Sequence, residues 1–221
     1  MVICCGVLLA IVAAGLGLLW ALQRVPESYR LALKVERKDS EEMVRRTTAL
    51  ISDVEKEGPW STKFTAEQIN GGLAFWLAEN YPDALPGAFR DPRVVIEPDR
   101  MLLFCKVEYG GVASVVTLTI EPYLPERRNI LALRICGVRA GALPWPLGKI
   151  IDGVSELARQ VDIQLDWKRT EGDPVALITI RPPADQPDKV VQIDSIELGE
   201  GHIYLGGTTR RRQETTPRSL P

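Results

Sequence analysis

Hydrophobic and polar positions along the first half of the chain repeat with a helical period. Over residues 39–57 apolar side chains recur at i, i+3 and i+4 spacing, which predicts an amphipathic helix. Its apolar face consists of Met43, Val44, Thr47, Leu50, Ile51 and Val54. Asp39 or Ser40 is suited to cap this helix, and Gly58-Pro59 marks its end.

A second helix is predicted to begin at Thr65 and to stop before Pro82. The residues Thr65-Ala-Glu-Gln68 match the capping-box pattern. Apolar residues follow at helical spacing, namely Ile69, Leu73, Trp76 and Leu77. The pair Gly71-Gly72 costs about 1 kcal/mol per glycine relative to alanine inside a helix. We therefore expect another element to approach closely there, and we interpret that element as a sheet.

From about residue 93 the pattern changes to alternation in twos, which is typical of strands. The predicted strands cover residues 93–97, 101–109, 112–122, 129–138, 161–167, 175–181, 190–198 and 202–206. A helix predicted over residues 147–160 interrupts them. Alternating strands with short connections favour an α+β fold, in which an antiparallel meander sheet packs against two or three helices.

The beginning of the chain has neither period. Val2–Leu22 contains no charged residue, and its 21 residues at about 1.5 Å each span roughly 32 Å, enough for a hydrocarbon core of about 30 Å. Trp20 and Arg24 suit a membrane interface. Because no basic residue precedes the segment and its end is a poor cleavage site, we interpret residues 2–22 as a retained transmembrane anchor rather than a signal peptide.

The predicted domain organisation follows from these patterns. Residues 1–23 are the anchor, 24–59 a juxtamembrane helical segment, 60–207 the α+β domain and 208–221 a polar tail that we expect to be disordered. The basic residues that follow the anchor are Arg24, Arg30, Lys34, Arg37 and Lys38. The positive-inside rule would leave the domain in the cytoplasm. A start upstream of Met1 would remove this conflict, so the orientation stays open here.

Charge and motifs argue against nucleic-acid binding and catalysis. The 27 Lys and Arg residues nearly balance 29 Asp and Glu residues, and no nucleic-acid-binding motif is present. No nucleophile elbow, phosphate loop, dinucleotide motif or zinc-binding pattern occurs. The sole histidine, His202, lies at a predicted strand start beside a turn, a placement that favours a surface role over catalysis. We therefore predict a non-enzymatic protein without metal or cofactor.

Cys105 and Cys136 lie in two predicted strands. Strict alternation places Cys105 with Leu103 and Val107, and places Cys136 opposite to Leu133 and its neighbours. A disulfide between the two cysteines would require a bulge that brings them to one face. The sequence leaves their pairing open.

Two short motifs complete the pattern. The first is Thr65, Ile69 and Asn70, and the second is Gly141, Leu143, Pro144 and Pro146. With the apolar segment and the meander, this order resembles the YpmS-type family of bacterial single-pass envelope proteins, over about residues 60–205. That family is distantly similar to tubular lipid-binding domains, in which a curved antiparallel sheet wraps a long helix and leaves an apolar groove. The resemblance implies acyl-chain binding by an extracytoplasmic domain at the bacterial cytoplasmic membrane.

We therefore expect a lipid or another apolar ligand in a groove between helix and sheet. The expected groove residues are Trp76, Leu103, Val107, Leu118, Ile120, Leu133, Ile135, Leu143 and Trp145. Residues 141–154, rich in proline and apolar side chains, would be either the rim of this groove or a buried joint. The alternative function is a scaffold for envelope assembly, in which the helix over residues 39–57 pairs with a protein partner.

Overall fold

The computed structural model describes residues 14–80, 89–109, 111–126, 129–160, 163–180 and 188–211. The described helices begin with a segment over residues 14–22. The others are α2 (Glu27–Ala32), α3 (Arg37–Val54), α4 (Ala66–Gly71), the π-helix η1 (Gly72–Trp76), α5 (Leu77–Asn80) and α6 (Leu147–Gln160). The helix predicted over residues 147–160 is thereby confirmed, and the helix predicted over 39–57 begins two residues earlier and ends at Val54.

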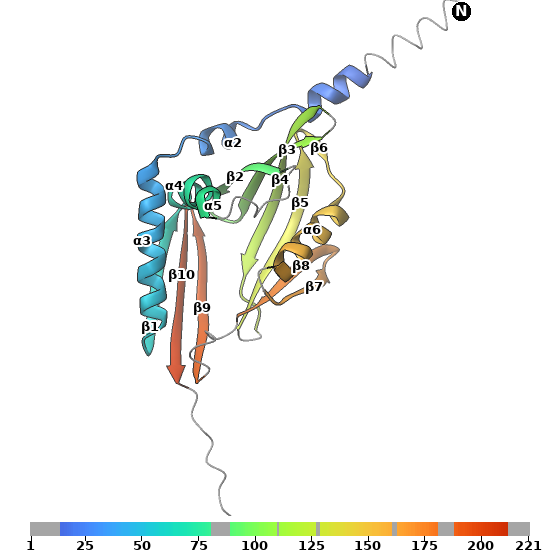
Figure 1. The fold of residues 1–221 in the computed structure, drawn as a ribbon. Coiled ribbons are helices and arrows are strands. Elements are labelled where there is room, and N and C mark those ends of the chain that lie inside the picture. Colours follow the sequence, from blue (N-terminus) through green and yellow to red (C-terminus); the bar gives the residue numbers. More distant parts are fainter. Residues whose placement is uncertain are drawn as a thin grey trace, which may run out of the picture.

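The strands form two antiparallel sheets (Figure 1). The strands are β1 (Gly58–Thr65), β2 (Phe89–Ile96), β3 (Met101–Tyr109), β4 (Val112–Tyr123), β5 (Ile130–Ala140), β6 (Leu143–Pro144), β7 (Leu165–Thr170), β8 (Asp173–Thr179), β9 (Lys189–Gly199) and β10 (His202–Arg211). The small sheet has the order β1-β10-β9, and the large sheet has the order β2-β3-β4-β5-β8-β7 with β6 beside β5. Helix α3 runs along the small sheet, and α6 lies over the large sheet (Figure 1).

The α+β content agrees with the prediction. The prediction of one meander sheet is wrong, because the strands form two sheets. The strand before the meander, β1, pairs with the last strand, β10, from Gly58↔Thr209 to Thr65↔His202. This pairing draws the β9-β10 hairpin away from β8 and creates a second sheet. Residues 208–211, assigned to the tail from the sequence, belong to β10. Alternation shows which face a side chain takes but carries no information on which strands pair.

The predicted membrane anchor is contradicted. Across the residues that the structure describes, no helix combines the length and the apolar character needed to cross a membrane. Residues 2–13 of the predicted span lie outside the described residues. The remainder is a helix over residues 14–22, and the chain after it turns at residues 23–26 before α2. The prediction of single-pass membrane localisation rests on this anchor and is therefore also contradicted.

The C-terminal end of this first helix forms hydrogen bonds with the large sheet and the turn beside it. The carbonyl oxygen of Ala21 accepts a hydrogen bond from the Ala142 N–H (2.9 Å). The carbonyl oxygen of Leu22 accepts one from the Ser114 hydroxyl (2.7 Å). A count of apolar residues could not reveal these contacts, because the partners lie far along the chain. The last turn of the apolar segment is therefore capped by the large sheet rather than continued.

The central core joins the two sheets. Phe64 of β1 and Ile203 of β10 pack against Val94 and Ile96 of β2. Met43 and Leu50 of α3, Ile69 of α4 and Leu103 of β3 pack around them. One compact apolar cluster thus binds both sheets to α3 and α4.

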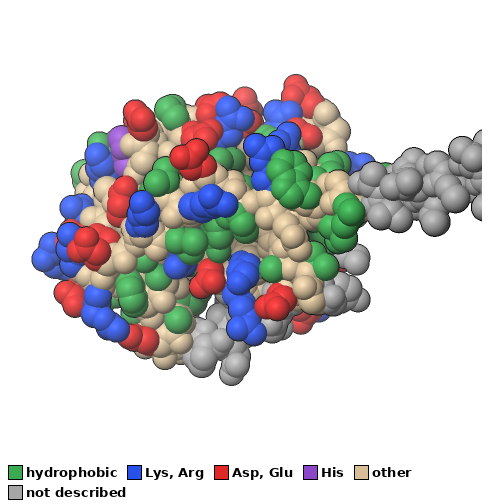
Figure 2. All heavy atoms as spheres, turned by 90° about the horizontal axis from the view of Figure 1, so that it is seen from above, with side chains coloured by type: hydrophobic (Ala, Val, Ile, Leu, Met, Phe, Trp, Pro, Cys, Tyr) green, Lys and Arg blue, Asp and Glu red, His purple; other side chains and the backbone are tan. Residues whose placement is uncertain are grey.

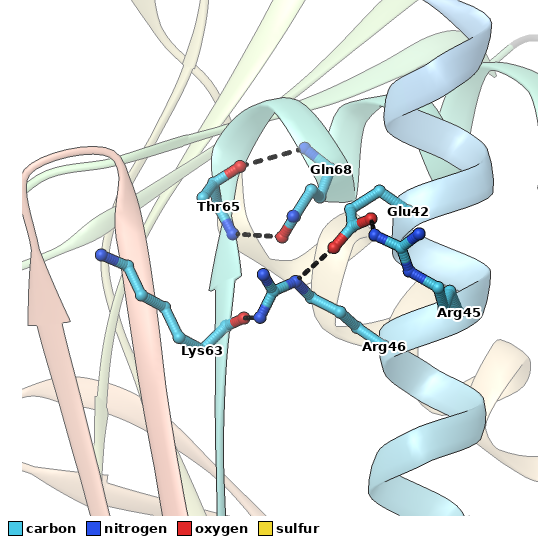
Figure 3. A network of polar contacts seen from close by, with 6 residues as sticks. All are labelled: Glu42, Arg45, Arg46, Lys63, Thr65 and Gln68. Carbon is cyan, nitrogen blue, oxygen red and sulfur yellow. Dashed lines mark hydrogen bonds and ion pairs between the residues drawn. The ribbon is translucent and has the colours of Figure 1, made fainter.

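Polar contacts fasten α3 to β1 and β1 to α4 (Figure 3). Glu42 forms ion pairs with Arg45 and Arg46 on the same face of α3, and the Arg46 Nη1 atom donates to the carbonyl oxygen of Lys63 (3.3 Å). At the start of α4 the Thr65 hydroxyl accepts from the Gln68 N–H (3.3 Å), and the Gln68 Oε1 accepts from the Thr65 N–H (3.0 Å). The predicted capping box is confirmed.

The surface shows no single-sign charge over the face seen from above (Figure 2). Lys and Arg side chains alternate there with Asp and Glu side chains, as expected from the balanced composition. Hydrophobic side chains gather at the end where the described chain begins. In the helix over residues 14–22, the side chains of Leu16, Leu18, Leu19 and Trp20 are exposed.

Candidate functional site

An apolar groove lies between α3 and the continuous helix formed by α4, η1 and α5. Its volume is ≈ 390 Å³. The groove is lined by Met43, Val44, Thr47, Thr48, Ile51, Ile69, Gly72, Leu73, Trp76 and Leu77. Apart from Thr48 and Gly72, these residues belong to the apolar faces that the sequence pattern predicts for the two helices.

Two glycines set the spacing of the helices. A Cβ atom added at Gly71 would lie 2.5 Å from the Ser40 backbone nitrogen and 2.7 Å from the Asp39 carbonyl carbon. A Cβ atom at Gly72 would lie 3.1 Å from the Cγ of Met43. The glycine pair therefore admits the backbone of α3, not the sheet that we expected from the sequence. The groove extends from this crossing along α3 toward Ile51.

A π-helical turn shapes the opposite wall. Residues Gly72–Trp76 form η1 between α4 and α5. A π-turn contains an extra residue, so it rotates the following side chains relative to an uninterrupted α-helix, and such turns are frequent at functional sites. Trp76 is 43 % exposed at the groove, opposite the half-exposed Val44 and Ile51 of α3. Three large apolar side chains thus remain accessible to a ligand.

The two helices are also tied by a polar contact outside the groove. Arg37, at the start of α3, forms an ion pair of 2.9 Å with Glu79 of α5. Its guanidinium also lies over the Phe75 ring, 5.2 Å from the ring centroid. Because both members of the ion pair are well exposed, the pair contributes at most about 1 kcal/mol to stability. The pair joins the start of α3 to the end of the α4–η1–α5 helix.

The groove wall consists of aliphatic side chains, the indole ring of Trp76 and the hydroxyl groups of Thr47 and Thr48. The Thr48 hydroxyl donates to the Val44 carbonyl oxygen (2.9 Å). No charged side chain lines the groove among the described residues. The lining therefore favours burial of apolar area, at about 25 cal/mol per Å². It supplies no general base and no activated nucleophile for a reaction.

Of the groove residues expected from the sequence, only Trp76 lies here. Six others share one face of the large sheet, because the register pairs Leu103 with Leu118 and Ile120 with Ile135. Those six are Leu103, Val107, Leu118, Ile120, Leu133 and Ile135. Leu143 lies in β6, opposite Ala140 of β5. The structure does not bring these sheet residues together with Trp76.

Packing under α6 accounts for the apolar stretch at residues 141–154. Trp145 and Leu147 pack against a buried cluster of Val116, Ile135, Val138 and Ala140. Val107, Leu118, Trp167 and Leu22 complete this cluster. In addition, the indole nitrogen of Trp167 donates to the Ser155 hydroxyl of α6 (2.8 Å). Trp145 is therefore part of a joint that connects β5, α6 and the end of the first helix.

The motif residue Asn70 also has a structural role. Its side chain is buried, and its amide forms two hydrogen bonds with the backbone of Val94. The contact with α3 made by Gly71 and the groove wall formed by Val44 and Ile51 could not be assigned from the sequence. The amphipathic pattern of residues 39–57 indicates that this helix packs against another element. It does not indicate that the element is α4.

The other reactive side chains do not converge on a site. Cys105 and Cys136 are free thiols. Burial raises the pKa of the Cys105 thiol to about 11. The pKa of the more exposed Cys136 thiol is also raised to about 11, by partial desolvation and by the Glu121 carboxylate, so little thiolate forms at neutral pH. His202 stacks edge-on against Tyr204, with ring centroids 4.9 Å apart. Within the part of the chain that the structure describes, no group of three or more metal-ligating side chains is assembled.

Comparison with known proteins does not assign the chain to a family. No protein-family model matches the chain. No curated protein matches its sequence significantly. The candidate function therefore follows from the geometry and chemistry of the groove.

Proposed function

We propose that the protein binds one apolar chain, such as the acyl chain of a lipid, in the groove between α3 and the α4–η1–α5 helix. The observation that carries this proposal is a groove of ≈ 390 Å³ whose lining is apolar apart from Thr47 and Thr48. Ligand pockets typically have volumes of about 300–1,000 Å³ and mostly apolar walls. The protein holds its ligand without converting it.

Burial of apolar area supplies the affinity. Val44, Ile51 and Trp76 are exposed by 41 %, 55 % and 43 %. A ligand that covered about 200 Å² of apolar surface would gain roughly 5 kcal/mol, from which the loss of ligand freedom must be subtracted. Micromolar affinity for a long chain therefore requires that the ligand bury apolar area of its own as well.

The experiment is displacement of a fluorescent acyl probe from the protein by a saturated fatty acid. Thr47→Phe places a ring inside the groove, and we expect it to weaken probe binding by at least about tenfold. Ala49→Phe is the matched control, because Ala49 is exposed on α3 and lies outside the groove lining. Equal binding by Thr47→Phe and the parent protein would rule out this groove as the site.

A second function, contact with a protein partner through α3, uses the same surface. Val44, Thr47, Thr48 and Ile51 have the i, i+3, i+4, i+7 spacing of a helix face that pairs with another helix. We therefore extend the test to sedimentation of the protein without a ligand. A concentration-dependent dimer that Thr47→Phe abolishes, together with no probe binding by the parent protein, would favour this second function.

A further inference from the structure

Arg93 of β2 is a buried arginine without a counter-charge among the described residues. It is 7 % exposed, and its Nη1 atom donates to the carbonyl oxygen of its own neighbour Pro92 (2.6 Å). Its Nε atom has no hydrogen-bond partner in the described part of the chain. Among the ion pairs found in the described chain, none includes Arg93. Because an unpaired buried cation costs several kcal/mol, an anion beside Arg93 would stabilise this position.

A β-bulge concentrates further positive charge beside Arg93. Arg90 pairs with Lys106 and Arg93 pairs with Phe104, so β2 has one residue more than β3 in this interval. In a regular strand, residues three apart point to opposite faces. The extra residue instead places Arg90, Arg93 and Lys106 on the same face of the large sheet. The left-handed backbone of Asp91, with φ 50°, lies inside this bulge.

No ion pair among the described residues neutralises this charge, although the carboxylate of Asp91 lies within the bulge. Arg90 is exposed and Lys106 is half-buried, and neither is found in an ion pair within the described residues. The Asp91 side chain is exposed, and it also forms no ion pair with Arg93. The Tyr29 hydroxyl of α2 donates to the Asp91 carbonyl oxygen (3.1 Å), which fixes the bulge against the helix. The positive face is therefore held in place but unpaired.

We propose that Arg93, with Arg90 and Lys106, forms a binding site for a phosphate group. An arginine fork presents parallel N–H donors that match the oxygens of a phosphate, and the two flanking cations add charge at the more accessible side. The buried fork supplies geometry, whereas Arg90 and Lys106 attract the anion from solvent. The site lies on the large sheet and is independent of the apolar groove, so it holds whether or not the groove binds a chain.

The test is thermal unfolding of the full chain in sodium phosphate, against sodium chloride and sodium sulfate at matched ionic strength. At a phosphate concentration about five times Kd, we expect Tm to rise by about 2–4 °C. Glycerol 3-phosphate is the second arm, which distinguishes a phosphate ester from free phosphate as the preferred source. A rise with either phosphate compound and none with chloride supports the site.

Arg93→Met keeps the volume of the side chain and removes its charge. We expect this variant to lose the phosphate-dependent rise, and Arg100→Met to retain it, because Arg100 is already paired with Glu97 and Asp99. If Arg93→Met does not fold, the double variant Arg90→Gln/Lys106→Gln tests the accessible part of the site and should reduce the rise at least by half. An equal rise in all variants, or equal effects of phosphate, sulfate and chloride on the parent protein, would overturn the proposal.

Discussion

The side-chain amide of Asn70 takes the place of a neighbouring strand beside Val94. Its Nδ2 atom donates to the Val94 carbonyl oxygen (2.8 Å), and its Oδ1 atom accepts from the Val94 N–H (2.7 Å). Val94 lies in β2, the edge strand of the large sheet. The Gly201 N–H, in the β9-β10 turn, donates to the Ile96 carbonyl oxygen farther along this edge (2.9 Å). Helix α4 and the small sheet therefore close an edge that would otherwise be open to another strand.

Replacing Asn70 should destabilise the fold. Asn70→Ala leaves the buried N–H and C=O groups of Val94 without partners, so we expect a loss of about 2–4 kcal/mol in the free energy of unfolding. Asn80→Ala is the control, because Asn80 is exposed and makes a single hydrogen bond to the Trp76 carbonyl oxygen. Urea unfolding measures both. A loss below 1 kcal/mol for Asn70→Ala would show that water replaces the clamp.

The crossing of α3 and α4 should depend on Gly71. Gly71→Ala forces a Cβ atom into the α3 backbone at Ser40, so we expect a loss of about 1–3 kcal/mol, and a displaced α3 should also distort the apolar groove. Gly148→Ala in α6 is the matched helical control, since nothing lies within 4 Å of its added Cβ atom. That control should stabilise the protein by up to about 1 kcal/mol. Similar free energies of unfolding for both variants would contradict the close approach.

Gly141 should be required for attachment of the first helix. Its φ is 57°, and an added Cβ atom would collide with the carbonyl oxygens of Ala21 and Leu22. We expect Gly141→Ala to increase hydrogen exchange at Ala142, whose N–H bonds to the Ala21 carbonyl oxygen. Gly172→Ala, at φ 95° with open space around the added atom, carries the backbone strain without the collision. Faster exchange at Ala142 in both variants would assign the effect to something other than this contact.

Cys105 should react slowly with alkylating reagents. Burial raises the pKa of its thiol from 9.0 to about 11, which lowers the thiolate fraction at pH 8 about 100-fold relative to an unperturbed thiol. Mass spectrometry after timed iodoacetamide treatment measures the rate in the folded protein and in urea. Alkylation in the folded protein at the rate found in urea would contradict the assigned environment.

The same pKa shift predicts a loss of stability in alkaline solution. The folded pKa of Cys105 lies above the unfolded value, so the folded state retains the proton between about pH 9 and 11 while the unfolded state releases it. The free energy of unfolding therefore falls as the pH rises through this range. Tyr29, whose pKa is raised to about 12, mainly by burial, should extend the decline above pH 10. Cys105→Ala should flatten the decline between pH 9 and 11 in urea unfolding experiments, and an unchanged slope would exclude this thiol as a cause.

Much of the local structure could be predicted because its causes are local. The capping box of Thr65 and Gln68 depends on side chains three residues apart, and both of its hydrogen bonds are present. The strands from β2 to β5 follow the alternation of neighbouring residues. The candidate site was harder to predict. The sequence pattern indicates an apolar groove position for Trp76, but it predicts partners on the sheet, whereas the structure places Val44 and Ile51 of α3 beside it.

The amino-acid sequence by itself determined the order of the main helices and strands, the capping box of α4 and the apolar side of each element, because these follow from contacts within a few residues. The cap of α3 was predicted wrongly, since its N-cap is Glu36 rather than Asp39 or Ser40. Only the tertiary structure decided that β1 pairs with β10 across most of the chain, that Gly71 admits α3, and that the last turn of the first helix ends against Ser114. Many surfaces of the helices and strands have similar hydrophobicity, so hydrophobicity alone does not specify which of them pack together. These contacts are settled by shape and by the satisfaction of buried hydrogen-bonding groups, which hydrophobic patterning does not encode. The burial of Arg93 and the unpartnered state of its Nε atom among the described residues likewise depend on the tertiary structure.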